Sequence, residues 1–188
     1  MALKHRFTIG FISGFVAALA CVAAGGLAFV SLAMKAAKRN FRPPLTAAAP
    51  ADQDLQLESL DGTYVKLSSL RGKVVFLNIW GTWCPPCVAE LPTIQSLYDQ
   101  LKNEPDIRFV IASRLDPPGV VKQFARLRSY TLPFYMVSDD FTPPRFSSDQ
   151  YPATFIVDKG GAIASRHVGG ADWNRPEVAA LLRKLAVQ

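Results

Sequence analysis

Two cysteines separated by two prolines are the residues of this chain best suited to chemistry. Cys84 and Cys87 stand in the sequence Trp-Gly-Thr-Trp-Cys-Pro-Pro-Cys, residues 80–87. A Cys-x-x-Cys pair serves either as half of a metal site or as a reversible dithiol. A zinc site takes four protein ligands, or three and a water, whereas the chain after residue 54 offers only these two thiols and one histidine, His167. The count therefore favours redox chemistry over metal binding.

A redox pair must be held so that one sulfur becomes a thiolate and meets a disulfide. Residues 74–80 form an apolar run interrupted only by Asn78, which is typical of a strand buried on both faces. Residues 85–101 then carry apolar side chains at helical spacing. Cys84 would thus stand at the start of a helix, where the helix dipole favours its anion. Cys87, one turn further, could resolve a mixed disulfide formed on Cys84.

The two prolines bear on the reducing strength of the Cys84–Cys87 pair. Neither Pro85 nor Pro86 has an N–H group, so neither can donate a hydrogen bond to the sulfur of Cys84, while the amide of Cys87 remains available. We therefore expect a moderately lowered pKa for the Cys84 thiol and a comparatively reducing pair.

The remaining pattern predicts an α/β fold with a mixed central sheet, helices on both faces and an N-terminal hairpin. The hairpin turn is expected at Asp61-Gly62, and Asn174 is a candidate N-cap for the last helix. Expected strands cover residues 55–57, 64–67, 74–80, 108–113, 134–137, 154–157 and 162–168, and expected helices cover residues 85–101, 120–127 and 175–187.

The N-terminal part has a different character. Residues 7–34 contain no charged side chain, and roughly 20 apolar residues suffice to cross a bilayer. A cleaved signal peptide, the alternative, would have an apolar region of roughly 7–15 residues. We predict a short flank (1–6), one transmembrane anchor (7–34), a tether (35–54) and the folded domain (55–188). Basic residues flank both ends of the anchor, so charge alone does not orient it.

Charge and cysteine count exclude other classes. The net charge is +6, but residues 1–54 hold six basic against two acidic residues and supply most of it. The domain has no basic run with interleaved aromatics, so a nucleic-acid partner is not expected. Cys21 lies in the apolar run, which leaves no cysteine pair for a structural disulfide scaffold.

Two motifs carry a family resemblance. Residues 78–84 (Asn-Ile-Trp-Gly-Thr-Trp-Cys) followed by Glu90-Leu91-Pro92, together with residues 151–158 (Tyr-Pro-Ala-Thr-Phe-Ile-Val-Asp), resemble the thioredoxin superfamily and, within it, the membrane-anchored TlpA/ResA-type reductases. The resemblance covers residues 55–188. It implies a thioredoxin-like fold, a catalytic domain on the extracytoplasmic (periplasmic) side of the inner membrane, and reduction of protein disulfides without a cofactor or resident metal.

The resemblance also implies roles for single residues. Pro152 matches a cis-proline whose loop lies against the cysteines and pairs with the substrate backbone. Glu90 matches a glutamate that handles protons near the cysteines. Asn78 stands where typical thioredoxins have a buried aspartate, so proton transfer to or from Cys87 would use Glu90, water or neither. The expected client-binding surface comprises Trp83, Pro85, Pro86, Tyr151 and Pro152, and the expected catalytic residues are Cys84, Cys87 and Glu90.

These expectations define a reductase of extracytoplasmic client proteins, apocytochrome c being one example, supplied by a membrane thiol donor of the DsbD/CcdA type. A disulfide oxidase or isomerase of the same fold is the main alternative, because direction depends on the reduction potential. A Sco-like copper-delivery protein would use Cys-x-x-x-Cys and a distant histidine, and the spacing here is one residue shorter. A thiol peroxidase shares the fold but generally lacks the Trp-Cys-Pro-Pro-Cys arrangement.

Overall fold

The computed structural model describes Gly26 and residues 54–138, 140 and 142–188. The chain divides into two units, Met1–Arg42 and Pro43–Gln188, and every element named below belongs to the second. Apart from Gly26 and Asp54, the expected anchor and tether lie outside the described residues and stay predictions. No helix among the described residues combines the length and apolar character needed to cross a membrane.

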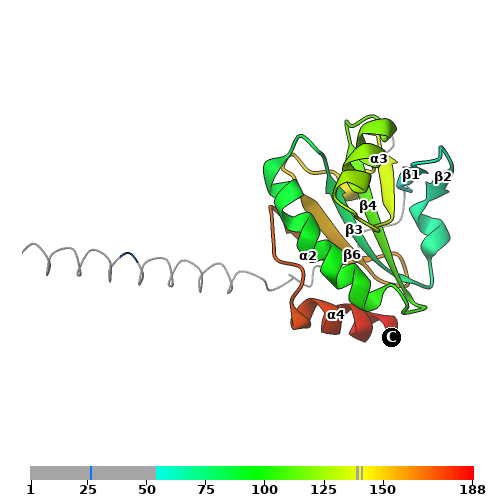
Figure 1. Ribbon diagram of the computed structural model, residues 1–188. Coiled ribbons are helices and arrows are strands. Elements are labelled where there is room, and N and C mark those ends of the chain that lie inside the picture. Colours follow the sequence, from blue (N-terminus) through cyan, green and yellow to red (C-terminus); the bar gives the residue numbers. More distant parts are fainter. Residues whose placement is uncertain (1–25, 27–53, 139, 141) are drawn as a thin grey trace, which may run out of the picture. The chain divides into compact units, whose positions relative to one another are not determined.

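The described chain forms one mixed sheet with the strand order β2-β1-β5-β4-β3-β6-β7 (Figure 1). Strands β3, β4 and β5 run parallel to one another, and the other neighbouring pairs are antiparallel. The expected hairpin and mixed sheet are therefore confirmed. The strands are β1 (Gln56–Ser59), β2 (Tyr64–Lys66), β3 (Val74–Trp80), β4 (Ile107–Arg114), β5 (Phe134–Val137), β6 (Ala153–Val157) and β7 (Ile163–Val168).

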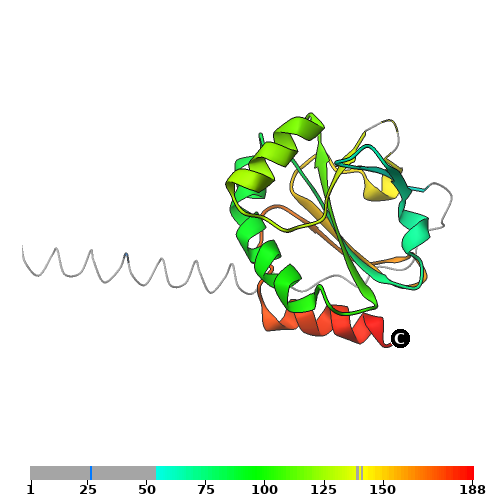
Figure 2. The same ribbon diagram turned by 45° about the vertical axis from the view of Figure 1, so that its right-hand side comes forward.

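The helices are α2 (Pro85–Leu101), α3 (Pro118–Leu127) and α4 (Pro176–Ala186), with short 3-10 helices η1 (Leu67–Leu70) and η3 (Pro144–Phe146). All three α-helices cover the same face of the sheet (Figures 1 and 2). The reason is the order β3-β4-β5: two successive right-handed crossovers that move the same way along a sheet place both of their helices on one side. The expected helices on both faces are confirmed only in part: among the described residues, the α-helices lie on one face, and the 3-10 helices η1 and η3 cover the other.

Strand β3 is buried throughout and divides two apolar layers. Val75, Leu77 and Ile79 pack on the face covered by η1 and η3. Trp80 points to the opposite face, where its ring lies 5.3 Å from that of Phe124 on α3. A strand that packs on both faces holds its carboxyl end, and hence the start of α2, in a fixed place.

The last helix begins differently from the prediction. Asn174 was expected as its N-cap, and this is wrong: the N-cap is Arg175, which makes no side-chain capping bond, and Pro176 takes the first helical position. Proline has the φ that this position needs, so it sets the boundary. The Asn174 Oδ1 atom instead accepts a hydrogen bond of 2.7 Å from Gln100 Nε2 on α2.

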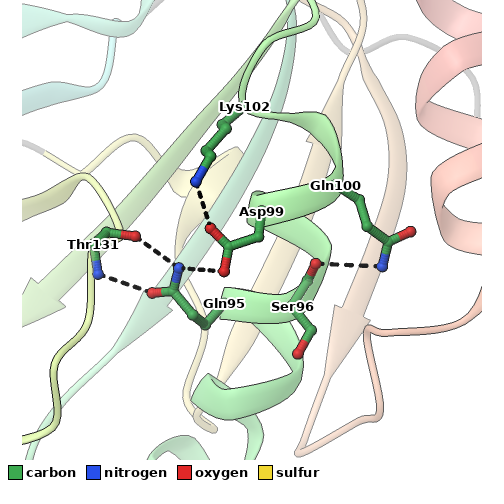
Figure 3. A network of polar contacts seen from close by, with 6 residues as sticks. All are labelled: Gln95, Ser96, Asp99, Gln100, Lys102 and Thr131. Atoms are coloured by element: carbon green, nitrogen blue, oxygen red, sulfur yellow. Dashed lines mark hydrogen bonds and ion pairs between the residues drawn. The ribbon is translucent and has the colours of Figure 1, made fainter.

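Helix α2 is also tied down along its exposed side (Figure 3). The Gln95 side chain donates to Thr131 Oγ1 (2.8 Å) and accepts from the Thr131 backbone N–H (2.9 Å). Further along, Lys102 pairs with Asp99 at 2.8 Å. The Gln95 contacts join the middle of α2 to the connection between α3 and β5, whereas the Lys102–Asp99 pair is local to the end of the helix.

Candidate active site

The two cysteines lie where the sequence places them, at the junction of β3 and α2. Cys84 is the N-cap of α2, Pro85 follows as its first residue, and Cys84 and Cys87 are joined by a disulfide with an S–S distance of 2.05 Å. Cys84 is 5% exposed, whereas Cys87 is fully buried. Of the two cysteines, Cys84 is therefore the one with exposed surface.

An aromatic platform, formed by Trp83, Tyr151 and Arg114, lies on the outer side of the disulfide. Trp83 is 49% exposed, and its indole N–H donates to the Arg114 carbonyl oxygen at 3.0 Å. The Trp83 and Tyr151 rings meet edge to face at 6.0 Å, and the Arg114 guanidinium lies over the Tyr151 ring at 5.0 Å. A half-exposed pair of rings with one cation is suited to contact an extended peptide. Pro85 and Pro86 are also exposed.

The loop before Cys84 is fixed by a carboxylate. Asp116 accepts hydrogen bonds from the Thr82 backbone N–H (2.8 Å) and hydroxyl (2.7 Å), and from the Ser113 hydroxyl (2.6 Å). Gly81 is required there, because a Cβ atom at this position would lie 2.3 Å from the Trp83 indole nitrogen. The platform's position is therefore set by packing and hydrogen bonds together.

Sequence reasoning missed Arg114 and Asp116. Arg114 ends β4 and Asp116 follows it, whereas the cysteines follow β3, and the carboxyl ends of neighbouring parallel strands meet at one edge of a sheet. That topology was the available signal, although it does not say which side chains are used.

The turn before β6 completes the outer side. The Tyr151–Pro152 peptide bond is cis, as the family resemblance predicted. Pro152 is buried, and its carbonyl oxygen accepts a hydrogen bond of 2.8 Å from the backbone N–H of Gly169. Through the contact of Tyr151 with Trp83, this turn lies against the loop that carries Cys84.

On the inner side lies a buried carboxylate, Glu90, which is only 3% exposed and follows Cys87 by one helical turn. Its Oε1 accepts a hydrogen bond from Asn78 Nδ2 at 2.8 Å, and its Oε2 accepts from the Ala171 backbone N–H at 3.0 Å and from Trp173 Nε1 at 2.9 Å. Burial raises the pKa of Glu90 to about 7, although these three hydrogen bonds oppose the rise. A carboxyl that titrates near neutral pH can both accept and return a proton.

A row of side chains crosses the sheet beneath Glu90. Asn78 on β3 pairs in register with Thr154 on β6, which pairs with His167 on β7. Asn78 Nδ2 also donates a hydrogen bond of 2.8 Å to Thr154 Oγ1. The His167 ring meets the Trp173 ring at 5.5 Å, and burial lowers the pKa of His167. Among the described residues, no group of three or more His, Cys, Asp or Glu side chains is placed to share a metal ion.

Trp173 is the member of this cluster for which no role was predicted. It is 83 residues from Glu90 along the chain, and nothing in its neighbourhood marks it as more than a loop residue before the last helix. Asn78 was predicted to be a buried strand residue that cannot titrate, but its contact with Glu90 was not predicted. Long-range contacts of this kind leave no local pattern to find.

The strand order, a Cys-x-x-Cys disulfide at the start of α2 and a cis-proline before β6 define a thioredoxin-like thiol-disulfide oxidoreductase. The profile of the Redoxin family matches residues 44–182, which is most of the chain. The chain belongs to this family and is a TlpA/ResA-like member of the thioredoxin superfamily.

Named relatives agree with this assignment. The chain is 34% identical over 126 residues to thiol-disulfide oxidoreductase ResA of Geobacillus kaustophilus, covering 66% of this chain and 72% of the relative. It is 30% identical over 133 residues to ResA of Halalkalibacterium halodurans, covering 70% and 75%. A thiol:disulfide interchange protein of Chlorobium tepidum shares the fold, with a TM-score of 0.60 at 21% identity over 75% of this chain and 98% of that protein.

Proposed function

We propose that this protein reduces disulfides of client proteins on the extracytoplasmic side of a membrane. The observation that carries the proposal is the asymmetry of the cysteine pair: Cys84 reaches the surface at a helix start, while Cys87 is buried with Glu90 one turn behind it. A two-step exchange requires an attacking thiol that a client can approach and a resolving thiol held behind it, and Cys84 is the cysteine of this pair with exposed surface.

The exchange follows from this arrangement. In the reduced protein, the Cys84 thiolate attacks one sulfur of a client disulfide; that S–S bond breaks, a mixed disulfide forms, and the released client thiolate takes up a proton. Cys87 then loses its proton to Glu90 and attacks the Cys84 sulfur, which releases the second client thiolate, and this thiolate also takes up a proton. The client gains two electrons and two protons, and the Cys84–Cys87 disulfide seen in the structure is left behind.

A dithiol must then restore the pair by giving back two electrons and two protons. A membrane thiol carrier of the DsbD/CcdA type fits this role if residues 7–34 anchor the chain, because both partners would share one bilayer. The uncharged stretch of 28 residues supports the anchor, and the likeness to thiol-disulfide oxidoreductase ResA supports exchange with a disulfide. Apocytochrome c is one candidate client.

The missing donors at Cys84 favour the reducing direction over oxidation or isomerisation. Pro85 and Pro86 occupy the first two positions of α2, so their nitrogens donate nothing to the Cys84 sulfur. A thiolate with fewer donors is less stabilised, and a pair whose reduced form is less stabilised is a stronger reductant.

Client trapping tests the proposal. In a Cys21→Ala background, Cys87→Ala should accumulate mixed disulfides on Cys84 with extracytoplasmic proteins, and dithiothreitol should release them. The matched control is Cys84→Ala with Cys87 intact, which should capture none because Cys87 is fully buried. Equal capture by both variants, or capture by neither from membranes that hold oxidised clients, would overturn the proposal.

A further inference from the structure

The two oxygens of the Glu90 carboxyl group have different partners. Oε2 accepts hydrogen bonds from the Trp173 indole N–H and the Ala171 backbone N–H. Oε1 has the Asn78 amide as its partner. An indole and a backbone amide can only donate, whereas a side-chain amide has a donor and an acceptor end.

This difference decides where a proton can sit. A proton on Oε2 would point at groups that are themselves donors, and two hydrogen bonds would be lost. A proton on Oε1 needs only an acceptor in the place of Asn78 Nδ2. Asn78 Oδ1 is buried and has no hydrogen-bond partner among the described residues, so a half-turn of the amide would present it to Glu90. Thr154 can follow the turn, because its hydroxyl donates as readily as it accepts.

We propose that Trp173 is a positioning residue that directs the exchangeable proton of Glu90 to Oε1, and that the Asn78 side-chain amide turns to accept it. The inference deepens the proposed function, since it concerns the group that would take the proton of Cys87. In this proposal Asn78 accepts the Glu90 proton through its neutral side-chain oxygen. An aspartate in its place would add a second negative charge beside Glu90.

The Trp173 indole is held in one orientation. Its ring meets Phe76 edge to face at 5.1 Å and His167 at 5.5 Å, and its backbone N–H donates to Thr93 Oγ1 at 3.0 Å. A ring enclosed in this way keeps its N–H aimed at Oε2.

The segment that ends in Trp173 also contacts the rest of the site. Gly169 donates to the Pro152 carbonyl oxygen at 2.8 Å, and a Cβ atom added at Gly170 would lie 3.4 Å from Pro86. Residues 169–173 therefore join the cis-proline turn, the first turn of α2 and Glu90. The two donors to Oε2 thus come from a segment that also contacts the cis-proline turn and the first turn of α2.

Few other charges bear on Glu90. Asn78 on β3 and Thr154 on β6 are uncharged, and the raised pKa of Glu90 has burial and hydrogen bonds as its causes, without a charged neighbour. The titratable groups to consider are Cys87 on the same helix and His167 on β7, which contacts Trp173. In the oxidised protein Cys87 does not titrate, so that form isolates Glu90 and His167.

The first test is a titration of the Glu90 carboxyl carbon by ¹³C NMR, in the oxidised full-length chain without client or donor, and with the signal assigned by Glu90→Gln. Trp173→Phe keeps a packed ring but removes a donor to the carboxylate, so the midpoint should rise by about one pH unit. The matched control is Trp80→Phe, which removes a buried indole N–H that does not contact Glu90 and should leave the midpoint unchanged. Equal midpoints in Trp173→Phe and the parent, or equal shifts in both variants, would overturn the inference.

The second test needs no variant in that region. In the parent chain, the ¹⁵N signals of the Asn78 side-chain amide should change with the same midpoint as the Glu90 carboxyl, because the amide turns when the proton arrives. An Asn78 amide that stays constant through the Glu90 titration would rule out the turn. Neither titration involves a client. A negative result in either titration would therefore leave the proposed direction of electron flow untouched, and the reverse also holds.

Discussion

The outer and inner sides of the Cys84–Cys87 disulfide are built from different interactions. Outside, rings and one guanidinium meet at 5.0 to 6.0 Å, and Trp83 is half exposed. Inside, Glu90 is fully enclosed and each of its polar contacts is a hydrogen bond of 2.8 to 3.0 Å. Under the proposed function, the two sides have separate tasks: the outer side selects the disulfide that reaches Cys84, and the inner side takes the proton of Cys87.

The largest effect is expected on the inner side. Glu90→Gln keeps the shape of the side chain but cannot take a proton, so resolution by Cys87 should slow about a thousandfold. Stopped-flow oxidation of the reduced protein by a model disulfide measures this step. Glu177→Gln, an exposed glutamate on α4, is the control and should react at the parent rate. A Glu90→Gln rate within threefold of the parent would remove Glu90 from the mechanism.

The same carboxyl should make stability fall as pH rises. Its pKa is about 7 in the folded protein against an ordinary 4.5, so between these values the folded state binds more protons than the unfolded state. The stabilisation is full below pH 4.5 and is lost as pH passes 7, a change of about 3 kcal/mol in the free energy of unfolding. Urea unfolding of the oxidised protein between pH 5 and 8 measures it, and Glu90→Gln should flatten the slope. An equal slope in both proteins would show that Glu90 titrates normally.

On the outer side, Gly81→Ala should displace Trp83, because the new methyl group would lie 2.3 Å from the indole nitrogen. We expect client reduction to fall about tenfold in kcat/KM, with the Glu90 midpoint unchanged. Gly119→Ala is a suitable control, since a Cβ atom there meets nothing within 4 Å. A shift in the midpoint of the Glu90 titration in Gly81→Ala would mean that the outer and inner sides of the disulfide are not independent.

The smallest effect is expected from Tyr151→Ala. Removing this ring takes away the edge-to-face contact with Trp83 and the cation–π contact with Arg114, which together contribute about 1 kcal/mol. The KM for a protein client should rise about fivefold, while reaction with a small disulfide stays constant. If both substrates slow equally, Tyr151 supports the cysteines rather than the client.

Much of the fold was predictable because its signals are local. Consecutive residues predict three features that are all present: the buried strand 74–80, the proline-initiated helix after it and the turn at Asp61-Gly62. The start of α4 was misplaced by one position because Pro176 outweighs the capping preference of Asn174.

The site was predictable only in part, for the same reason. The cysteines and the cis-proline lie in short motifs. Glu90 could be named from the family resemblance, but its burial could not, because Asn78, Ala171 and Trp173 reach it from β3 and from a loop near the other end of the chain. Arg114 and Asp116 likewise depend on which strands are neighbours. Contacts between distant segments are settled by tertiary packing, which leaves no pattern along the sequence.

The proposed function requires Cys84 and Cys87 to cycle between dithiol and disulfide as a reductant, and the decisive measurement is the reduction potential of the full-length chain at pH 7. Equilibration with glutathione or dithiothreitol buffers should give a reduction potential of about −270 mV, in the range of thioredoxin. A value near about −120 mV, in the range of strongly oxidising relatives of the fold, or a pair that does not equilibrate at all, would contradict the account.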